Sequence, residues 1–449
     1  MRKRLLVLSV IALIVLPAAA TFAAGQGEAA KGPVVLKWYT DSDDVTNTTV
    51  RKSPEFIADF EKQNPGIKVE IQSLVGTYDS DAYNKKADVM IAAGEQIDLL
   101  SESTLDRVVA KVNAGVLEPL NAYAEKEGVN LEKEYNGIIP IGGKTYTIPE
   151  YVTCWLVYIN KDMLDAAGLL APPRDWTWAD YRDYAKKLTH GTGASKVYGS
   201  YMHNWDWFYA IGMQSKIIDK PYFKRDGTPN FDDPVFRDGL QYRWNLEQVD
   251  QSQITVADML SQKMAYRAVF FGGKAAMLPM GAWMVADIKN KDNFPHTFKT
   301  TFATFPRWDA TCKPNTTTLD GAGSGWGINS KSKHKEAAYK FLRYFTSKGW
   351  EYAHPLWSAW TKTDATATVK AMGGPDETLY DPVALQNIVY DPQRMQNKYT
   401  FAGPGEPEVV DAWIGESQKY LVGGQSLDDA MANIKQKAKD IVARVKASQ

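Results

Sequence analysis

The residues of this sequence that could do chemistry are tryptophans that stand beside acidic residues and glycines. A sugar presents apolar C–H faces and a rim of hydroxyl groups, so an aromatic ring can stack on a face while a carboxylate bonds the rim. The densest example is the run Trp205-Asp206-Trp207. Other tryptophans in this kind of setting are Trp283, Trp326, Trp357 and Trp360. Each of them fits a hydrophobic core equally well, so only their shared setting favours a ligand-binding role.

Carboxylates can also carry out acid–base chemistry. Glu102, Glu150 or Asp206 could supply the paired acids of a glycoside hydrolase, and sequence spacing does not exclude this. Motifs for other chemistries fail. The run at 142–145 resembles the end of a phosphate-binding loop, but Ile138 stands where that motif needs glycine. The five histidines show no metal-binding spacing and no G-x-S-x-G motif is present, so we expect no cofactor and no metal.

The first residues have the parts of an export signal. Three basic residues at 2–4 precede an apolar run at 5–16, and small residues follow up to Ala23. We therefore expect residues 1–23 to be a signal peptide and residues 24–33 to be a disordered lead-in. No cysteine lies near this site to carry a lipid anchor, so we expect a periplasmic or otherwise extracytoplasmic protein without that anchor.

The composition of the remaining chain excludes some partners. There are 52 basic and 53 acidic residues, a net charge of −1, so no broad attraction to nucleic acid or lipid is implied. From Val34 onward no apolar run is long enough to cross a bilayer, and the length allows two domains. Cys154 and Cys312 lack metal-ligand spacing. Export permits a disulfide, and the sequence leaves their pairing open.

The elements that must position the candidate residues alternate between strands and helices. Strands are predicted at 34–40, 67–71 and 97–100, with one helix opening at Pro54 and another at 83–93. This order predicts a parallel, doubly wound sheet, in which ligands sit beyond the carboxyl ends of the strands. The polar loops after the first and third strands lie at those ends.

The stretch 270–283 combines a Gly pair, a short apolar run, a single glycine and an indole. The apolar run at 275–280 is bounded by glycine and contains proline, so we predict a buried strand that ends at the flexible Gly281 and presents Trp283. Other predicted elements are an apolar strand at 150–159, a helix at 178–188 capped by Thr177, helices at 335–345 and 427–445, and a glycine-rich crossing at 320–329.

This stretch also resembles a known family. The residues Phe271-Gly272-Gly273-Lys274-Ala275-Ala276-Met277 and Gly281-Ala282-Trp283 are similar to a segment of the family 1 extracellular solute-binding proteins, the sugar receptors of ABC importers. Segments at 56–69, 148–164 and 337–345 resemble the same family in the same order. The resemblance runs from about Val34 to the C-terminus.

The resemblance implies an α/β fold: the two-lobed periplasmic-binding-protein fold of type II, with a hinge of three segments. We expect an N-terminal lobe from 34–148 plus 281–322, a C-terminal lobe from 153–278 plus 327–449, and hinge crossings at 149–152, 279–280 and 323–326. Glycine-rich crossings would absorb the backbone rotation of lobe closure.

The resemblance also implies a non-enzymatic receptor. It would close on a mono- or oligosaccharide and deliver it to an inner-membrane ABC permease, acting as a monomer. The expected ligand-binding residues are Tyr39, Asp41, Asp43, Glu102, Glu150, Tyr151, Trp205, Asp206, Trp207, Trp283, Trp326 and Trp357. Two alternatives remain: a secreted glycan-degrading enzyme that uses two of these acids, and a receptor of the same fold for a cationic solute such as a polyamine.

Overall fold

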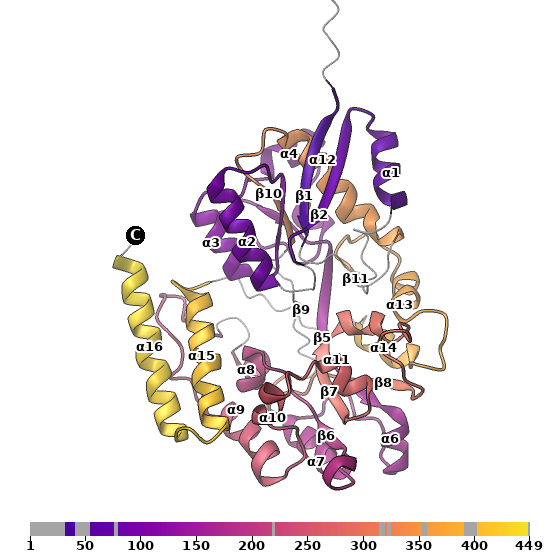
Figure 1. Ribbon diagram of the computed structural model, residues 1–449, viewed down its shortest axis with the longest axis vertical. Helices are drawn as coiled ribbons and strands as arrows, with labels where there is room; N and C mark the ends of the chain where they lie inside the picture. The colour runs from indigo at the N-terminus through magenta and orange to yellow at the C-terminus, as the bar shows by residue number, and fades with distance from the viewer. Residues whose placement is uncertain are drawn as a thin grey trace, which may run out of the picture.

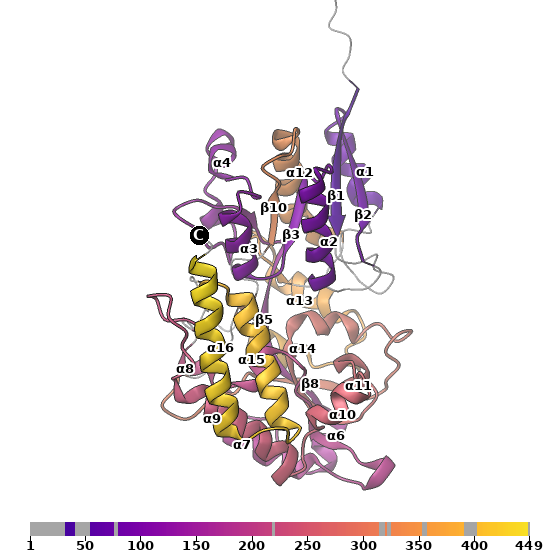
Figure 2. The ribbon, with the colours of Figure 1, turned by 60° about the vertical axis from the view of Figure 1, so that its left-hand side comes forward.

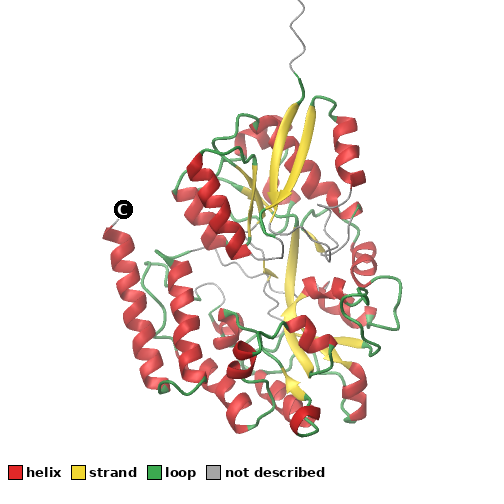
Figure 3. Ribbon diagram, in the orientation of Figure 1, coloured by secondary structure: helices red, strands yellow, loops and turns green. Residues whose placement is uncertain are grey.

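The computed structural model describes residues 32–40, 54–75, 80–217, 221–313, 319–320, 325–352, 357–389 and 402–447. Two groups of strands, each flanked by helices, lie one beyond the other along the long axis (Figure 1; Figure 3). We call them the N-terminal lobe and the C-terminal lobe. The predicted signal peptide, Asp41 and Asp43 lie outside the described residues.

The N-terminal lobe is built on a five-stranded sheet in the order β2-β1-β3-β10-β4. Its strands are β1 (Val34–Thr40), β2 (Ile67–Ser73), β3 (Leu99–Glu102), β4 (Thr147–Ile148) and β10 (Gly325–Ile328). β1 runs parallel to both β2 and β3, as the alternation of strands and helices predicted, whereas β10 is antiparallel to β3 and β4. The helices are α1 (Pro54–Gln63), α2 (Ser80–Ala93), α3 (Leu105–Asn113), α4 (Asn121–Glu127), α5 (Leu131–Glu134) and α12 (Lys335–Lys348), followed by η6 (Gly349–Glu351).

Aromatic side chains form the core of the N-terminal lobe. Trp38 on β1 contacts Phe345 of α12 with ring centroids 4.7 Å apart and Trp326 of β10 at 5.1 Å. The predicted apolar face of α12, Ala338, Phe341, Leu342 and Phe345, is buried. Helix α12 therefore belongs to this lobe although it lies late in the chain.

The C-terminal lobe is built around the ten-residue strand β5 (Tyr151–Asn160). Its sheet has the order β11-β5-β7-β6, and β8 and β9 also pair with β5. The other strands are β6 (Tyr198–Ser200), β7 (Ala275–Gly281), β8 (Thr300–Thr304), β9 (Leu319–Asp320) and β11 (Trp357–Ser358). Every residue of β7 is buried, which confirms the buried strand predicted there.

Helices cover this second sheet. They are α6 (Lys161–Ala166), α7 (Trp178–Leu188), α8 (Met213–Lys216), α9 (Pro234–Trp244), α10 (Val256–Ser261), α11 (Tyr266–Phe271), α13 (Ala365–Gly373), α14 (Pro382–Val389), α15 (Glu406–Leu421) and α16 (Leu427–Ala447). Short helical turns are η2 (Gly193–Ser195), η3 (Asp206–Tyr209), the π-helical η4 (Asn245–Val249) and η5 (Ala282–Asp287). The predicted cap of α7 is present, because Thr177 and Asp180 form a reciprocal capping box. Helices α15 and α16 lie side by side, and α15 also contacts α3 of the other lobe (Figure 2).

The division of the chain between lobes differs from the predicted one. β8 pairs with β5, so 300–304 belongs to the C-terminal lobe, and β10 with α12 returns to the N-terminal lobe. β7 pairs with β5 along 277–281, so 279–280 lies inside a sheet and is not a crossing. Glycine and proline content indicates where a backbone can bend, but it does not reveal which sheet a strand joins.

Two further features concern the cysteines and the length of the apolar helices. Cys154 is buried on β5 and Cys312 is half-buried, and no disulfide joins these two cysteines. Among the described residues, no helix has the length and apolar character needed to cross a membrane.

Candidate functional site

Five aromatic side chains meet at one end of the C-terminal sheet. They are Trp155, His203, Trp205, Tyr266 and Trp283, which we call the aromatic cluster. The ring centroids of Trp155 and Trp283 are 5.3 Å apart, those of Trp205 and Trp283 are 5.9 Å apart, and those of Trp155 and Trp205 are 6.0 Å apart. These pairs meet edge to face, which is a favourable arrangement for aromatic rings.

The pairing of β5 and β7 brings two of the cluster residues together. Trp155 lies opposite Gly281, the last residue of β7, and Trp283 follows two residues later in η5. Only two residues separate strand β5 from β4 of the N-terminal sheet. The first half of β5 is therefore the part of this strand that lies nearest the N-terminal lobe. The aromatic cluster therefore lies at the end of the C-terminal sheet that faces the other lobe.

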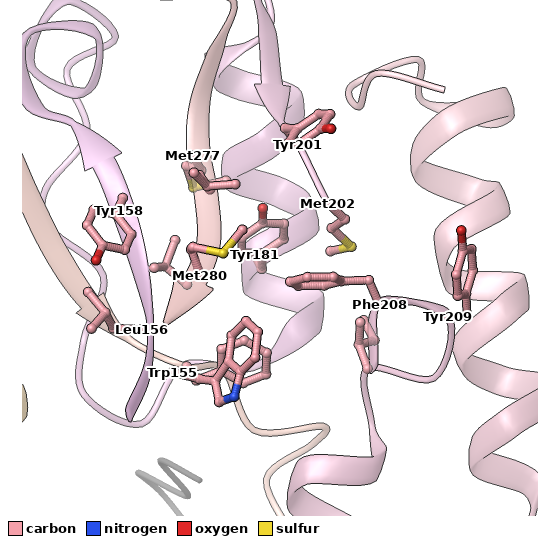
Figure 4. Close-up of a cluster of buried hydrophobic side chains, with 14 of the residues drawn as sticks. Trp155, Leu156, Tyr158, Tyr181, Tyr201, Met202, Phe208, Tyr209, Met277 and Met280 are labelled. Carbon is pink, nitrogen blue, oxygen red and sulfur yellow. The ribbon is translucent and has the colours of Figure 1, made fainter. Parts of the chain in front are cut away.

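The members of the aromatic cluster differ in how far they are buried. Trp155 is only 3% exposed, whereas His203, Trp205, Tyr266 and Trp283 are half-buried. Trp155 belongs to a core in which β5, β7 and the 201–209 segment bring together buried side chains that include Met202, Phe208, Met277 and Met280 (Figure 4). The half-buried rings of Trp205, Tyr266 and Trp283 pack against this core.

Polar groups tie the cluster together. Trp283 Nε1 donates to Tyr266 Oη at 3.2 Å, and His203 Nδ1 lies 3.0 Å from Tyr201 Oη. Burial, with the positive charges of Arg243 and Arg267, lowers the pKa of His203 to about 4. His203 is therefore neutral near pH 7 and can both donate and accept a hydrogen bond.

Other predicted site residues of the C-terminal lobe lie nearby but have protein partners. Asp206 is half-buried and accepts a hydrogen bond from the Tyr222 hydroxyl, while its backbone carbonyl accepts from Trp413 Nε1 at 3.3 Å. Trp207 is half-buried against the core. Trp357 lies on β11, where its backbone pairs with Val152 of β5. The side chain of Trp357 lies outside the described part of the structure.

In the N-terminal lobe, Glu102 at the end of β3 is enclosed. Its carboxylate is 0% exposed and lies 2.9 Å from Lys111 Nζ, which also donates to Asn84 Oδ1 at 3.0 Å. Burial raises the pKa of Glu102 to about 7, although the Lys111 charge acts in the opposite direction. Glu102 thus forms an ion pair with Lys111 of α3, and a role of Glu102 in ligand binding stays a prediction.

The remaining predicted residues lie near the passage between lobes. Glu150 is half-buried and its carboxylate accepts from Trp326 Nε1 at 3.3 Å. Tyr151, the first residue of β5, is also half-buried, and Tyr39 at the end of β1 is buried. Trp326 is 3% exposed within the N-terminal core, where its ring meets those of Trp38 and Phe345 in T-shaped contacts, so stacking on a ligand has no support there.

Sequence reasoning missed three members of the aromatic cluster. Trp155 lies in an apolar strand and resembles a core residue, and Tyr266 has no distinctive neighbours in sequence. His203 begins the aromatic run that contains Trp205, but nothing in its sequence setting marks it as a ligand-binding residue. Within the described parts of the chain, no group of three or more His, Cys, Asp or Glu residues could hold a metal ion.

Comparison with known proteins decides the family. Residues 46–352 match the family model described as bacterial extracellular solute-binding protein. The chain belongs to this family. The resemblance noted in the sequence is thereby confirmed, and the two-sheet α/β architecture of this solute-binding protein agrees with it. A solute-binding protein is a receptor, so membership argues against the alternative of a glycan-degrading enzyme.

The solute-binding protein has sequence and structural relatives. It is 23% identical over 354 residues to the multiple sugar-binding protein of Streptococcus mutans, an alignment that covers 77% of this chain and 79% of the relative. A sugar transporter structure from Rhizobium etli in an open conformation is 24% identical, with a TM-score of 0.69 over 90% of this chain and 99% of that one. An ABC substrate-binding protein from Listeria monocytogenes in complex with cycloalternan is 23% identical, with a TM-score of 0.70 over 91% and 98%. These structures share the fold of the solute-binding protein.

Proposed function

We propose that this solute-binding protein captures a carbohydrate between its two lobes and delivers it to an ABC-type importer. The observation that carries the proposal is the aromatic cluster, whose half-buried rings Trp205, Tyr266 and Trp283 lie at the end of the C-terminal sheet nearest the N-terminal lobe. The names of its relatives point to the same class of ligand: a multiple sugar-binding protein and a receptor bound to cycloalternan.

The chemistry of the cluster suits a sugar. Trp205 and Trp283 offer apolar faces for C–H groups, and neutral His203, whose Nδ1 lies against Tyr201 Oη, has Nε2 as its other ring nitrogen for a sugar hydroxyl group. Glu150 supplies a carboxylate in the passage from β4 to β5, and Asp206 supplies another in η3, next to Trp205. Further proposed acceptors are Asp41 and Asp43 after β1, and Tyr39, Glu102, Tyr151, Trp207 and Trp357 remain proposed contributors of contact surface.

Closure of the lobes would complete the site. The chain passes from β4 to β5 at 149–150 and from β9 to β10 between 320 and 325, and it returns by way of β11. We infer that these passages form the hinge, because they are the short connections between the two lobes and would have to absorb the backbone rotation of lobe closure. The proposed partner is an inner-membrane ABC permease, the proposed location is the periplasm, and the proposed receptor is a monomer.

Titration of the purified mature protein with a panel of mono- and oligosaccharides tests the proposal. We expect tryptophan fluorescence to change saturably with at least one sugar, and that sugar to stabilise the protein by roughly 2.7 kcal/mol at a hundredfold excess over the dissociation constant. Chromatography should recover the sugar intact. Absence of any response across the panel, or release of new reducing ends, would contradict the proposal.

A further inference from the structure

Arg243 lies buried beneath the 202–208 segment, which carries two members of the aromatic cluster. Its side chain is 0% exposed and stands near the end of α9, just before the π-helical turn η4. The guanidinium donates to three backbone carbonyls: Nη2 to Met202 O at 3.1 Å, and Nη1 to His203 O at 3.3 Å and Phe208 O at 3.2 Å. These carbonyls lie on both sides of Trp205, so one side chain binds both ends of the segment.

The charge of Arg243 is matched by an equally buried acid. Its Nε donates to Glu247 Oε1 at 2.8 Å, and both side chains are 0% exposed. The other carboxylate oxygen of Glu247 accepts from Val256 N at 3.0 Å, and Gln253 Nε2 lies 3.3 Å from Oε1. The guanidinium also lies 4.6 Å from the ring centroid of Tyr209. The pair is thus fully surrounded by protein and satisfied by hydrogen bonds.

Stability alone gives a poor account of this pair. Replacing a buried ion pair by well-packed apolar residues is often neutral or stabilising, because desolvation offsets the attraction between the charges. What an apolar pair does not supply is a donor for each buried carbonyl of the segment. The planar guanidinium can serve several carbonyls at once, whereas a lysine ammonium presents one compact donor group. The geometry of Arg243 therefore matches the task of fixing a backbone.

We propose that Arg243, supported by Glu247, is a positioning residue for ligand binding that fixes the 202–208 segment so that His203 and Trp205 stay aligned with Trp283. This inference rests on the proposed carbohydrate-binding function. The segment has regular structure only in the short turn η3, so its remaining backbone depends on such bonds. Without them, the segment must be ordered when the ligand binds, and that cost weakens affinity.

The variant Arg243→Lys keeps the charge beside Glu247 but removes the fork of donors. The matched control is Arg182→Lys, because Arg182 on α7 of the same lobe pairs with Asp250, where its Nη2 donates to Oδ1 at 2.9 Å. With the best-binding sugar of the panel, we expect Arg243→Lys to weaken affinity at least about tenfold and Arg182→Lys to leave it within about twofold. Equal affinities for wild type and Arg243→Lys would overturn the proposal.

A double-variant cycle separates positioning from general destabilisation. If Arg243 acts through the 202–208 segment, then Arg243→Lys should cost less affinity in the Trp205→Ala background than it costs in the wild-type protein. Fully additive losses would show that Arg243 acts elsewhere and would overturn the proposal. Should Arg243→Lys fail to fold, the paired substitution Arg243→Met with Glu247→Met removes both charges together. The affinity of this variant is then compared with that of the wild type and measured again in combination with Trp205→Ala.

Hydrogen exchange of the ligand-free protein gives a readout that does not depend on the sugar. We expect the amides of 202–208 to exchange at least about tenfold faster in Arg243→Lys and to be unchanged in Arg182→Lys. Unchanged exchange in both variants would overturn the positioning role. A wild-type protein that binds no sugar of the panel contradicts the proposed function, whereas the exchange data still decide whether Arg243 orders the segment.

Discussion

Gly281 leaves the space that the indole of Trp283 occupies. A Cβ atom at Gly281 would lie 2.0 Å from Cζ3 of Trp283, far inside contact distance. The backbone there has a negative φ of −73°, so the glycine is required by the close approach of the ring and not by a left-handed conformation. The flexible strand end expected at Gly281 from the sequence has a packing role instead, because β7 remains inside the C-terminal sheet.

Substituting Gly281→Ala should therefore displace Trp283 from its edge-to-face contact with Trp155. Such overpacking costs about 1–3 kcal/mol of unfolding free energy, and we expect carbohydrate affinity to fall as well. Chemical denaturation and calorimetric titration measure the two effects. The control is Gly415→Ala in α15, where nothing lies within 4 Å of the added methyl group. Wild-type behaviour of Gly281→Ala would contradict the packing role.

Trp283 and Trp326 should respond differently to truncation. Trp326 is 3% exposed in the N-terminal core, so Trp326→Ala should cost about 3–5 kcal/mol of unfolding free energy. Trp283 is half-buried, so Trp283→Ala should cost less stability and should abolish sugar binding. Denaturation and titration of both variants side by side make the comparison. If Trp283→Ala costs as much stability as Trp326→Ala and still binds sugar, Trp283 is an ordinary core residue.

Local pattern was sufficient for much of the fold. The three parallel strands of the N-terminal sheet and the helices at 178–188 and 335–345 follow from periodicity, capping residues and turns, all of which are short-range signals. The glycine-rich segment expected to be a crossing at 323–326 instead contributes β10 to that sheet. Which sheet β8 and β10 join depends on pairing between residues more than 100 positions apart, such as Leu156 with Thr304. No local pattern carries that information, so the predicted lobe boundaries after 281 were wrong.

The candidate site shows the same limit. Trp283 and Trp326 both stand within two residues of a glycine in sequence, yet Trp283 is half-buried at the end of the C-terminal sheet and Trp326 lies inside the N-terminal core. Trp155 joins the cluster only because β5 places it opposite Gly281. The tryptophan chemistry was readable from sequence, whereas the sorting of tryptophans between core and site required the packing.

Glu102 should make folding stability depend on pH. Its pKa of about 7 lies above the ordinary value for a glutamate in an unfolded chain, so its contribution is present in full below about pH 4.5 and is lost as pH rises through 7. Glu102→Gln removes this titration. We expect the variant to gain stability relative to wild type between pH 5 and pH 8 in urea denaturation. A constant difference across that range would contradict the assignment.

His203 should titrate in the opposite sense. Its pKa of about 4 lies below the ordinary value near 6.5, so the unfolded chain takes up a proton first and stability is lost as pH falls from about 6.5 to 4. Nuclear magnetic resonance of the histidine rings, with His203→Asn to identify the signal, follows this group. We expect sugar affinity to hold down to about pH 5 and to weaken towards pH 4. A midpoint near 6.5 for His203 would contradict its buried, neutral state.

The most direct test of the account is a calorimetric titration of an oligosaccharide series into the wild-type protein and into the double variant Trp205→Ala/Trp283→Ala. Removing two stacking faces at once loses about 0.5–1.5 kcal/mol for each aromatic contact in addition to the apolar area that each ring buries. Together these losses should weaken binding by roughly a hundredfold or more. The account predicts saturable binding of one sugar by the wild type and none measurable by the double variant. Binding of equal strength by both proteins, or no heat from any sugar with the wild type, would contradict it.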